Sequence, residues 1–218
     1  MPAAADDPGQ RALPADLGRL LHDLRGPLNS LTMHVEVLKR VVGDDPIAED
    51  SLRTVLEQLG RLSDMLPAAF AVASLEPSSR VPVNLGAVAA AARQDAGGTV
   101  TLAADGWPSV IGDVRLLTLA VSHLLRNAVE ATASGARPPH VSAAVEGEEA
   151  RLSIRDWGPG LRTTDTKLLI RLLHSTKPGH RGLGLVTVER IARLHGGTLR
   201  FAAPGDGTLV TLALPRQP

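Results

Sequence analysis

The sequence predicts an α+β protein, in which an antiparallel helical hairpin is followed by an α/β sandwich of one sheet backed by helices. Three observations support this prediction: an apolar repeat near the N-terminus, a proline- and serine-rich break after it, and mixed strand and helix patterns beyond the break. The later strands and helices do not alternate strictly, which favours a sheet with helices on one face over a parallel βαβ sheet.

Apolar residues at alternating steps of four and three mark the first helix, from Leu17 to Val42. This 3.5-residue period is typical of supercoiled helices. The turn GDDP at 43–46 ends the helix, and the same spacing returns from Leu52 to Ala69. A lone hairpin cannot cover its apolar face, so we expect the hairpins of a homodimer to form a four-helix bundle.

The chain is expected to divide into four segments. Residues 1–11 are a disordered lead-in, 12–76 the helical hairpin, 77–84 a linker, and 85–216 the sandwich domain. Within that domain the patterns predict helices near 85–96, 113–133 and 183–195, and strands near 99–104, 109–112, 140–147, 150–157, 197–203 and 207–215.

Composition excludes several classes of protein. The 218 residues are 44% hydrophobic but only 2% aromatic, with no tyrosine, so alanine and leucine must fill most of the core. Lysine plus arginine (23) equals aspartate plus glutamate (23), which argues against a nucleic-acid binder. The absence of cysteine excludes disulfides and fits a cytoplasmic location. No apolar run approaches the ~20 residues of a membrane span, and the N-terminus lacks the pattern of a signal peptide.

A histidine lies in the first helix, in the motif HDLRGPLN. His22 flanks the apolar face, and a neutral imidazole can act as a nucleophile at pH 7. Asp23 could orient the ring and accept its proton. Pro27 removes a helical hydrogen bond one turn later. Taken alone, the motif is better explained as a solvated helix histidine, so its interpretation depends on motifs elsewhere.

Two further motifs contain polar groups suited to a nucleotide. Asn127, in HLLRNAVEA, offers a neutral oxygen that suits Mg2+. Asp156 ends a predicted strand in IRDWGPGL, where Gly158 and Gly160 permit unusual backbone conformations. A carboxylate in such a turn can accept a hydrogen bond from an exocyclic amine, such as that of adenine. In isolation, Asn127 is better explained as a surface asparagine, and an ordinary Asp-Gly turn explains the second motif equally well.

The fourth motif is STKPGHRGLGL, in which Gly182 and Gly184 stand at the start of a predicted helix. Backbone N–H groups at a helix start favour phosphate. Lys177 could reach a γ-phosphate or close a lid. The spacing matches neither a Walker loop nor a dinucleotide-binding fingerprint.

The order of these four motifs resembles that of the two-component sensor histidine kinases. HDLRGPLN looks like their H box, HLLRNAVEA their N box, DWGPGL their G1 box and TKPGHRGLGL their G2 box. The Thr-Lys-Pro and Asn-Ala-x-Glu-Ala patterns are similar to the nitrogen-sensor branch. The resemblance covers nearly all of the chain after the first dozen residues.

This resemblance implies an ATP-dependent protein-histidine kinase that phosphorylates His22 and passes the phosphoryl group to an aspartate of a response regulator receiver domain. Asp23 would be the base, Asn127 would chelate Mg2+, and Asp156 would bind the adenine amine. The residues that would shape the nucleotide pocket and lid are Gly158, Gly160, Gly182 and Gly184. No sensor domain precedes Leu13. We therefore expect either that the sequence is part of a longer protein or that a separate sensor protein supplies the input.

The sequence departs from the family pattern at four places, and two of these lead to specific expectations. His123 stands where the N box usually begins with asparagine, and His180 replaces the first glycine of the G2 box. The lid segment 168–177 lacks the usual phenylalanines and proline, so we expect a loosely packed lid and weaker nucleotide affinity. Gly26 replaces the threonine or asparagine that positions water in family members with phosphatase activity. We therefore expect slow dephosphorylation of the regulator.

Other functions remain open at this point. The main alternative is a histidine phosphotransfer protein whose degenerate ATPase-like domain does not use ATP. A hydrolytic ATPase such as a gyrase or chaperone would place a glutamate where His123 stands, and would not need His22. A serine kinase acting on an anti-sigma partner would not need the helical hairpin. A purely structural helical dimer leaves the second half of the chain unexplained.

Overall fold

The computed structural model describes residues 13–42, 45–132, 137–161 and 183–216, with side chains from Leu24 onward. The chain forms two compact units, Met1–Ser74 and Leu75–Pro218. The lead-in predicted for 1–11 and the whole lid segment 168–177 lie outside the described residues.

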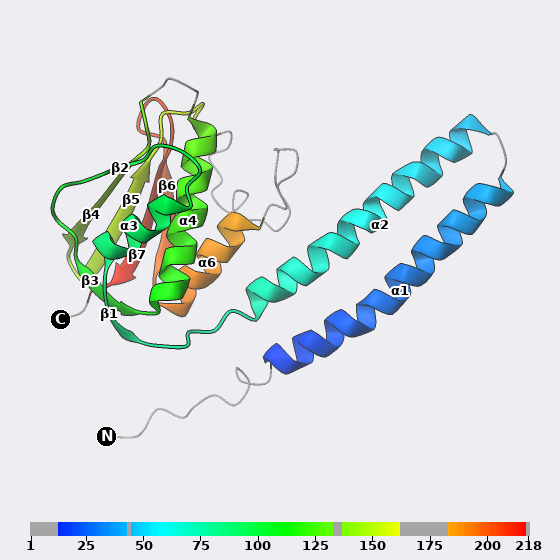
Figure 1. Ribbon diagram of the computed structural model, residues 1–218, viewed down its shortest axis with the longest axis horizontal. Helices are drawn as coiled ribbons and strands as arrows, with labels where there is room; N and C mark the ends of the chain where they lie inside the picture. Colours follow the sequence, from blue (N-terminus) through cyan, green and yellow to red (C-terminus); the bar gives the residue numbers. More distant parts are fainter. Residues whose placement is uncertain (1–12, 43–44, 133–136, 162–182, 217–218) are drawn as a thin grey trace. The chain divides into compact units, whose positions relative to one another are not determined.

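The first unit is a pair of helices, α1 (Leu13–Val41) and α2 (Pro46–Ala73), that pack against one another along their length (Figure 1). Asp45 caps α2 by accepting a hydrogen bond from the Ile47 N–H at 3.0 Å, and Pro46 occupies the first turn. This arrangement is favourable, because the N–H that proline lacks would have no helical partner there. Both helices lie where the apolar repeat predicts them.

The apolar face of the helical pair is largely uncovered in a single copy of the chain. Among its described residues only Leu59 is a buried hydrophobic side chain. Leu31, Leu38 and Leu62 follow the predicted seam, yet they are 53%, 50% and 44% exposed. Large apolar side chains exposed in such a row usually mark a surface that another protein covers.

The second unit is built on a five-stranded sheet with the order β2-β4-β5-β7-β6. The β2–β4 pair is parallel, and the other neighbours are antiparallel. The strands are β2 (Thr101–Leu102), β4 (His140–Glu146), β5 (Glu149–Arg155), β6 (Thr198–Ala202) and β7 (Leu209–Pro215).

A second, two-stranded sheet pairs β1 (Val81–Asn84) with β3 (Ser109–Gly112) in antiparallel register. The segment 77–84 was expected to be a linker throughout, and its second half is instead this strand. Val83 is buried in the core, whereas its neighbours on the strand are exposed. The segment is rich in proline and serine, which are unfavourable in strands, so its sequence does not predict a strand. The strand forms by pairing with β3.

Helices α3 (Leu85–Gln94), α4 (Val114–Ala131) and α6 (Gly184–Leu194) cover one face of the five-stranded sheet (Figure 1). Helix α4 is the central one and packs against both α3 and α6. The two-layer sandwich expected from the sequence is therefore confirmed. Leucine and alanine make up most of the buried hydrophobic residues, which lets the helices approach closely in a domain with few aromatic side chains.

The other face of the sheet carries polar and charged pairs, both within a strand and between strands. Ser153 of β5 lies 3.1 Å from Thr211 of β7 between their hydroxyl oxygens. Glu149 binds Arg151 and Arg200, each at 2.8 Å. This alternation of apolar and polar faces is typical of an antiparallel sheet with one face covered.

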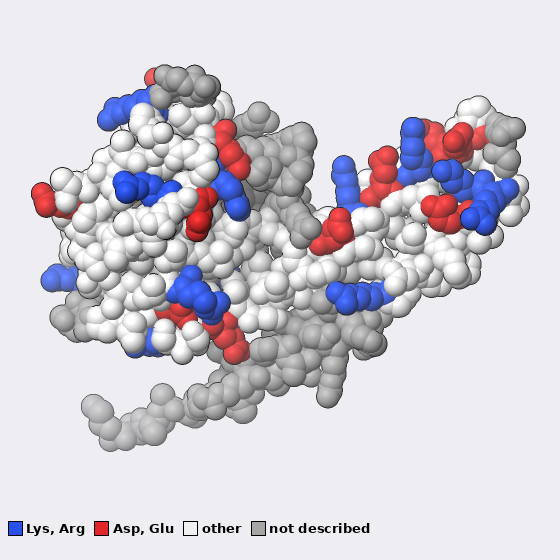
Figure 2. All heavy atoms as spheres, in the orientation of Figure 1, with Lys and Arg blue, Asp and Glu red and all other residues white. Residues whose placement is uncertain are grey.

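Charged side chains of both signs are interspersed over the visible face of the two units (Figure 2). This face shows no extended field of one sign, in agreement with the balanced composition. None of the helices in the described ranges combines the length and apolar character that a membrane-spanning helix requires.

A buried aspartate joins three parts of the second unit. Asp113 is 1% exposed and caps α4 by accepting a hydrogen bond from the Leu116 N–H at 3.1 Å. Its other carboxylate oxygen accepts from the N–H and hydroxyl of Ser78 at 2.7 and 2.8 Å. The Asp113 N–H donates to His195 Nε2 at 3.0 Å, at the end of α6. The start of the domain is thus tied to the start of α4 and the end of α6.

The hydrogen bonds to Asp113 also decide its protonation. Burial alone would raise the pKa of this carboxyl, but the bonds from Ser78, Leu116 and Ser79 outweigh it. Together they lower the pKa from an ordinary value of 3.8 to about 2. The folded state therefore favours the charged form.

We expect Asp113→Asn to lower the free energy of unfolding by about 1 to 3 kcal/mol at pH 7, because an uncharged amide accepts weaker hydrogen bonds. The folded-state pKa is lowered, so the wild-type advantage is complete above pH 4 and disappears as the pH falls toward 2. Urea unfolding at pH 7 and between pH 4 and 2 measures both effects. Asp105→Asn, at an exposed bend, is the matched control; equal losses in the two variants would contradict the assignment.

Candidate functional site

The predicted phosphoacceptor lies in helix α1. The backbone of His22 and Asp23 is helical, and their side chains lie outside the described residues. Gly26 is exposed one turn later, and no described atom lies within 4 Å of the position where a Cβ would be. Pro27 follows within the same helix. The expected roles of His22 and Asp23 therefore rest on their motif and its place in the helix.

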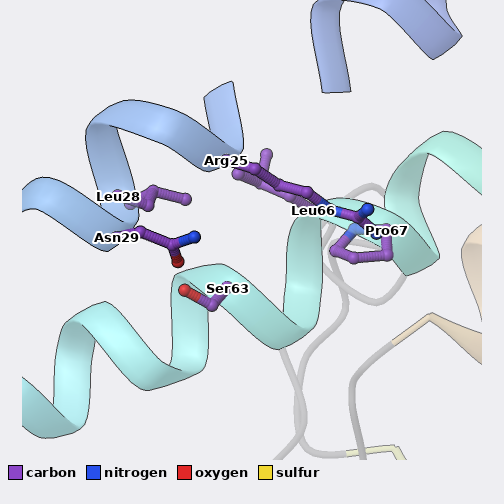
Figure 3. A pocket seen from close by; sticks show the side chains of 6 residues that line it. All are labelled: Arg25, Leu28, Asn29, Ser63, Leu66 and Pro67. Carbon is purple, nitrogen blue, oxygen red and sulfur yellow. The ribbon is translucent and has the colours of Figure 1, made fainter. Parts of the chain in front are cut away.

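A pocket of about 270 Å³ opens between α1 and α2, beginning three residues after His22. It is lined by Arg25, Leu28, Asn29, Ser63, Leu66 and Pro67. Asn29 of α1 and Ser63 of α2 face one another across it (Figure 3). The two helices thus leave polar groups accessible next to the predicted phosphoacceptor.

Asp156 follows the last residue of β5 and is 5% exposed. Its Oδ1 accepts hydrogen bonds from the Gly158 N–H at 2.9 Å and the Thr208 N–H at 3.0 Å. The Asp156 N–H donates in turn to the Thr208 carbonyl at 2.9 Å. The other oxygen, Oδ2, accepts no hydrogen bond from the described part of the chain. One carboxylate oxygen is therefore fixed by the protein, and the second remains to bind a ligand.

Three glycines let the chain approach closely around Asp156. A Cβ on Gly158 would lie 2.5 Å from the Ala131 carbonyl oxygen at the end of α4. A Cβ on Gly207 would lie 2.1 Å from the Asp156 carbonyl oxygen, and Gly160 has a φ of +76°. Each of these residues is needed for the fold of the loop itself. The predicted importance of Gly158 and Gly160 thus has a structural cause.

Asn127 is half-buried on α4, and the flanking residues Leu124, Leu125 and Ala128 are buried as the sequence predicts. His123, Asn127 and Ala131 are spaced four residues apart and so share one face of the helix. Gly158 lies against this face at Ala131, one turn beyond Asn127.

The start of helix α6 lies against the same face of α4 at His123, two turns before Ala131. Gly184 is the first residue of α6, and a Cβ there would lie 3.6 Å from His123 Nδ1, an ordinary contact distance. No side chain in the described part of the chain caps the helix at Leu183, so its first N–H groups can bind another acceptor. Among the described residues, nothing in the packing requires glycine at position 184. Lys177 and Gly182 lie outside the described residues.

His123 has an altered protonation equilibrium. Burial lowers the pKa of its imidazole, and the nearby positive charge of Arg126 lowers it further. Arg126 Nη2 donates a hydrogen bond to His123 Nδ1 at 2.7 Å. The ring is therefore neutral at pH 7.

Three residues near Asp156 are not among the site residues that the sequence predicts. Gly207 and Thr208 were interpreted only as the start of the last strand, although they hold the Asp156 backbone and carboxylate. A Gly-Thr pair before the final strand is the signal that could have pointed to them. Trp157 was also passed over; its ring lies 4.2 Å from the Arg137 guanidinium and 5.9 Å from that of Arg155.

The residues present fit a nucleotide with its metal. A buried carboxylate with one open oxygen stands at one end of the α4 face, and an uncapped helix start stands at the other. The described residues contain no group of three histidine, cysteine, aspartate or glutamate side chains that could hold a metal. A metal here would take most ligands from phosphate and water, as Mg2+ commonly does.

Comparison with known proteins agrees with this geometry. Residues 112–218 match the family described as Histidine kinase-, DNA gyrase B-, and HSP90-like ATPase. The Sensor-like histidine kinase SenX3 of Mycobacterium tuberculosis is 26% identical over 212 residues, which cover 89% of this chain and 52% of SenX3. The chain therefore spans about half the length of that relative.

Two solved structures are also similar. The mycobacterial sensor histidine kinase MprB is 30% identical, with a TM-score of 0.52, and the match covers 64% of this chain and 99% of that one. The ATP binding domain of PrrB from Mycobacterium tuberculosis is 27% identical with a TM-score of 0.53, covering 65% of this chain and 100% of that one. The chain belongs to the two-component sensor histidine kinases and carries their ATP-binding catalytic domain.

Proposed function

We propose that this protein binds ATP-Mg in the Leu75–Pro218 unit and transfers the γ-phosphoryl group to His22. In this step the bond from phosphorus to the β–γ bridging oxygen breaks and ADP leaves. A bond from phosphorus to an imidazole nitrogen forms, and Asp23 accepts the ring proton. The phosphoryl group then passes to an aspartate on the receiver domain of a response regulator.

The α4 face is the observation that carries this proposal. His123, Asn127 and Ala131 lie along it, with Gly184 against the first and Gly158 against the last. Eight residues of helix separate these ends by about 12 Å. This spacing supports a nucleotide that lies along α4, with adenine on the open oxygen of Asp156 and phosphates at the start of α6.

The metal is proposed to bind between these two ends. Asn127 would supply one oxygen to Mg2+, and water and phosphate oxygens would supply the others. When bound, the metal would neutralise charge on the phosphates during transfer. Lys177, Gly182 and Gly184 are proposed to complete the pocket and its lid.

Dimerisation and partners form part of the same proposal. The exposed row of Leu31, Leu38 and Leu62 supports a homodimer that buries the apolar face in a four-helix bundle. The reaction is proposed to take place in the cytoplasm, where ATP is available. Either a further part of a longer chain or a separate sensor protein supplies the input, and the nitrogen-sensor branch stays a prediction.

The competing function is phosphotransfer without ATP, in which His22 receives its phosphoryl group from another protein. An open carboxylate oxygen at Asp156 and an unexplained glycine at 184 favour the kinase. A domain that had lost nucleotide binding would have no need to keep either feature.

We expect incubation with γ-labelled ATP and Mg2+ to label the wild type on His22 with an acid-labile phosphoryl group. His22→Ala should abolish the label, and Asp156→Asn should reduce it strongly by removing an acceptor for the adenine amine. His34→Ala is the matched control, because this exposed histidine lies on the same helix. Full labelling of His22→Ala, or no labelling of a wild type that binds ATP, would contradict the kinase assignment.

Gly184 is expected to serve nucleotide binding, whereas Gly158 serves the fold of the loop, and two measurements distinguish these roles. Gly184→Ala should change the free energy of unfolding by less than about 1 kcal/mol. It should weaken ATP binding by about tenfold or more, because a methyl group keeps phosphate from the backbone. Gly158→Ala should instead destabilise the domain by about 1 to 3 kcal/mol, since its Cβ would overlap the Ala131 carbonyl.

Calorimetry of ATP-Mg binding and urea unfolding provide the two readouts. Gly60→Ala in α2 is the matched control, because no described atom lies within 4 Å of its Cβ position. Normal ATP affinity in Gly184→Ala would argue against phosphate at the start of α6.

A further inference from the structure

The His123–Arg126 pair determines which ring nitrogen of the histidine carries a proton. Arg126 Nη2 lies 2.7 Å from His123 Nδ1. A guanidinium has only N–H donors and no acceptor, so Nδ1 must be the unprotonated acceptor of this bond. A neutral ring bonded in this way carries its single proton on Nε2.

This tautomer restricts what His123 can bind. A histidine that binds a metal must offer the lone pair of a ring nitrogen. The lone pair of His123 Nδ1 already accepts the hydrogen bond from Arg126. Nε2 carries the proton and cannot coordinate a metal. The ring therefore differs from the asparagine expected at this position, whose side-chain oxygen can accept or ligate. His123 can offer a ligand one hydrogen-bond donor.

The location of the ring indicates the ligand group that would accept this bond. The His123 ring lies against Gly184, at the uncapped start of α6, and two helical turns from the Gly158 loop that adjoins Asp156. No described residue accepts a hydrogen bond from Nε2. Phosphate oxygens are acceptors and favour a helix start, whereas the adenine amine is a donor and needs an acceptor, such as the Asp156 carboxylate.

We propose that His123, held in its Nε2–H form by Arg126, donates a hydrogen bond to a phosphate oxygen of the bound nucleotide and takes no part in holding the metal. This inference rests on the proposed function, because it takes a nucleotide lying along α4 as its starting point. Arg126 acts as a positioning residue that sets the tautomer, and its positive charge also favours phosphate at this end.

The binding test compares His123→Ala, His123→Gln and His34→Ala in the full chain, with calorimetry of ATP, ADP and adenosine. His123→Ala should weaken ATP binding by about tenfold to a hundredfold, the effect of a hydrogen bond to a charged acceptor. Adenosine binding should be unchanged. His123→Gln keeps a donor and should recover most of the affinity, and His34→Ala should match the wild type.

A ligand-independent test uses nitrogen NMR of the free protein, which distinguishes the two neutral imidazole tautomers. The His123 ring should show the Nε2–H form in the wild type and a shift toward the Nδ1–H form in Arg126→Gln. Thermal unfolding of each variant checks that the domain remains folded.

Several results would overturn the inference. These are an Nδ1–H ring in the wild type, unchanged ATP affinity in His123→Ala, or an equal loss of adenosine binding. A wild type that binds no ATP would overturn the inference together with the proposed function. Normal ATP binding by the wild type with no effect of His123→Ala would overturn the inference alone, so the two failures are distinguishable.

Discussion

Three segments that are distant in the sequence meet at the carboxylate and amide of Asp113. The carboxylate holds Ser78 at the beginning of the domain and caps α4, and the amide reaches His195 at the end of α6. Asp113 therefore links α4 to α6, through its carboxylate at the start of α4 and its backbone N–H at the end of α6. Since the candidate site lies along α4 and at the start of α6, its geometry depends on the same residue.

Small side chains are the second constraint on the site. Alanine-rich packing lets α3, α4 and α6 lie close together on the sheet. Gly158 and Gly207 extend this close packing into the loops, where backbone meets backbone without a Cβ between them. A domain poor in aromatic residues thus gains rigidity around Asp156 from close backbone contact.

Much of the fold follows from periodicity. The helices α1, α2, α4 and α6 lie within a few residues of their predicted ranges, because each carries a clear apolar face. The strand β1 could not be predicted, since four residues containing a proline acquire strand character only by pairing with β3. Asp113 was also not singled out, because its importance depends on Ser78 and His195, which are remote in sequence.

The site was predictable to a similar degree. The motifs predict Asn127, Asp156 and Gly184 as candidate site residues, because the motifs that contain them follow one another in the order typical of the family. The contact between Gly184 and His123, and that between the Asp156 carboxylate and Thr208, required the fold. A sequence pattern indicates which groups are present, but it does not specify which nitrogen of a histidine is protonated.

The stacking of Trp157 against Arg137 has an optical consequence. The chain contains two tryptophans, two phenylalanines and no tyrosine, so its near-ultraviolet emission comes almost entirely from the two indoles. Trp107 donates to the Ala103 carbonyl beside α3, and Trp157 adjoins Asp156. The protein therefore carries a natural fluorophore at the Asp156 end of its candidate site, and a second indole elsewhere in the same domain as an internal reference.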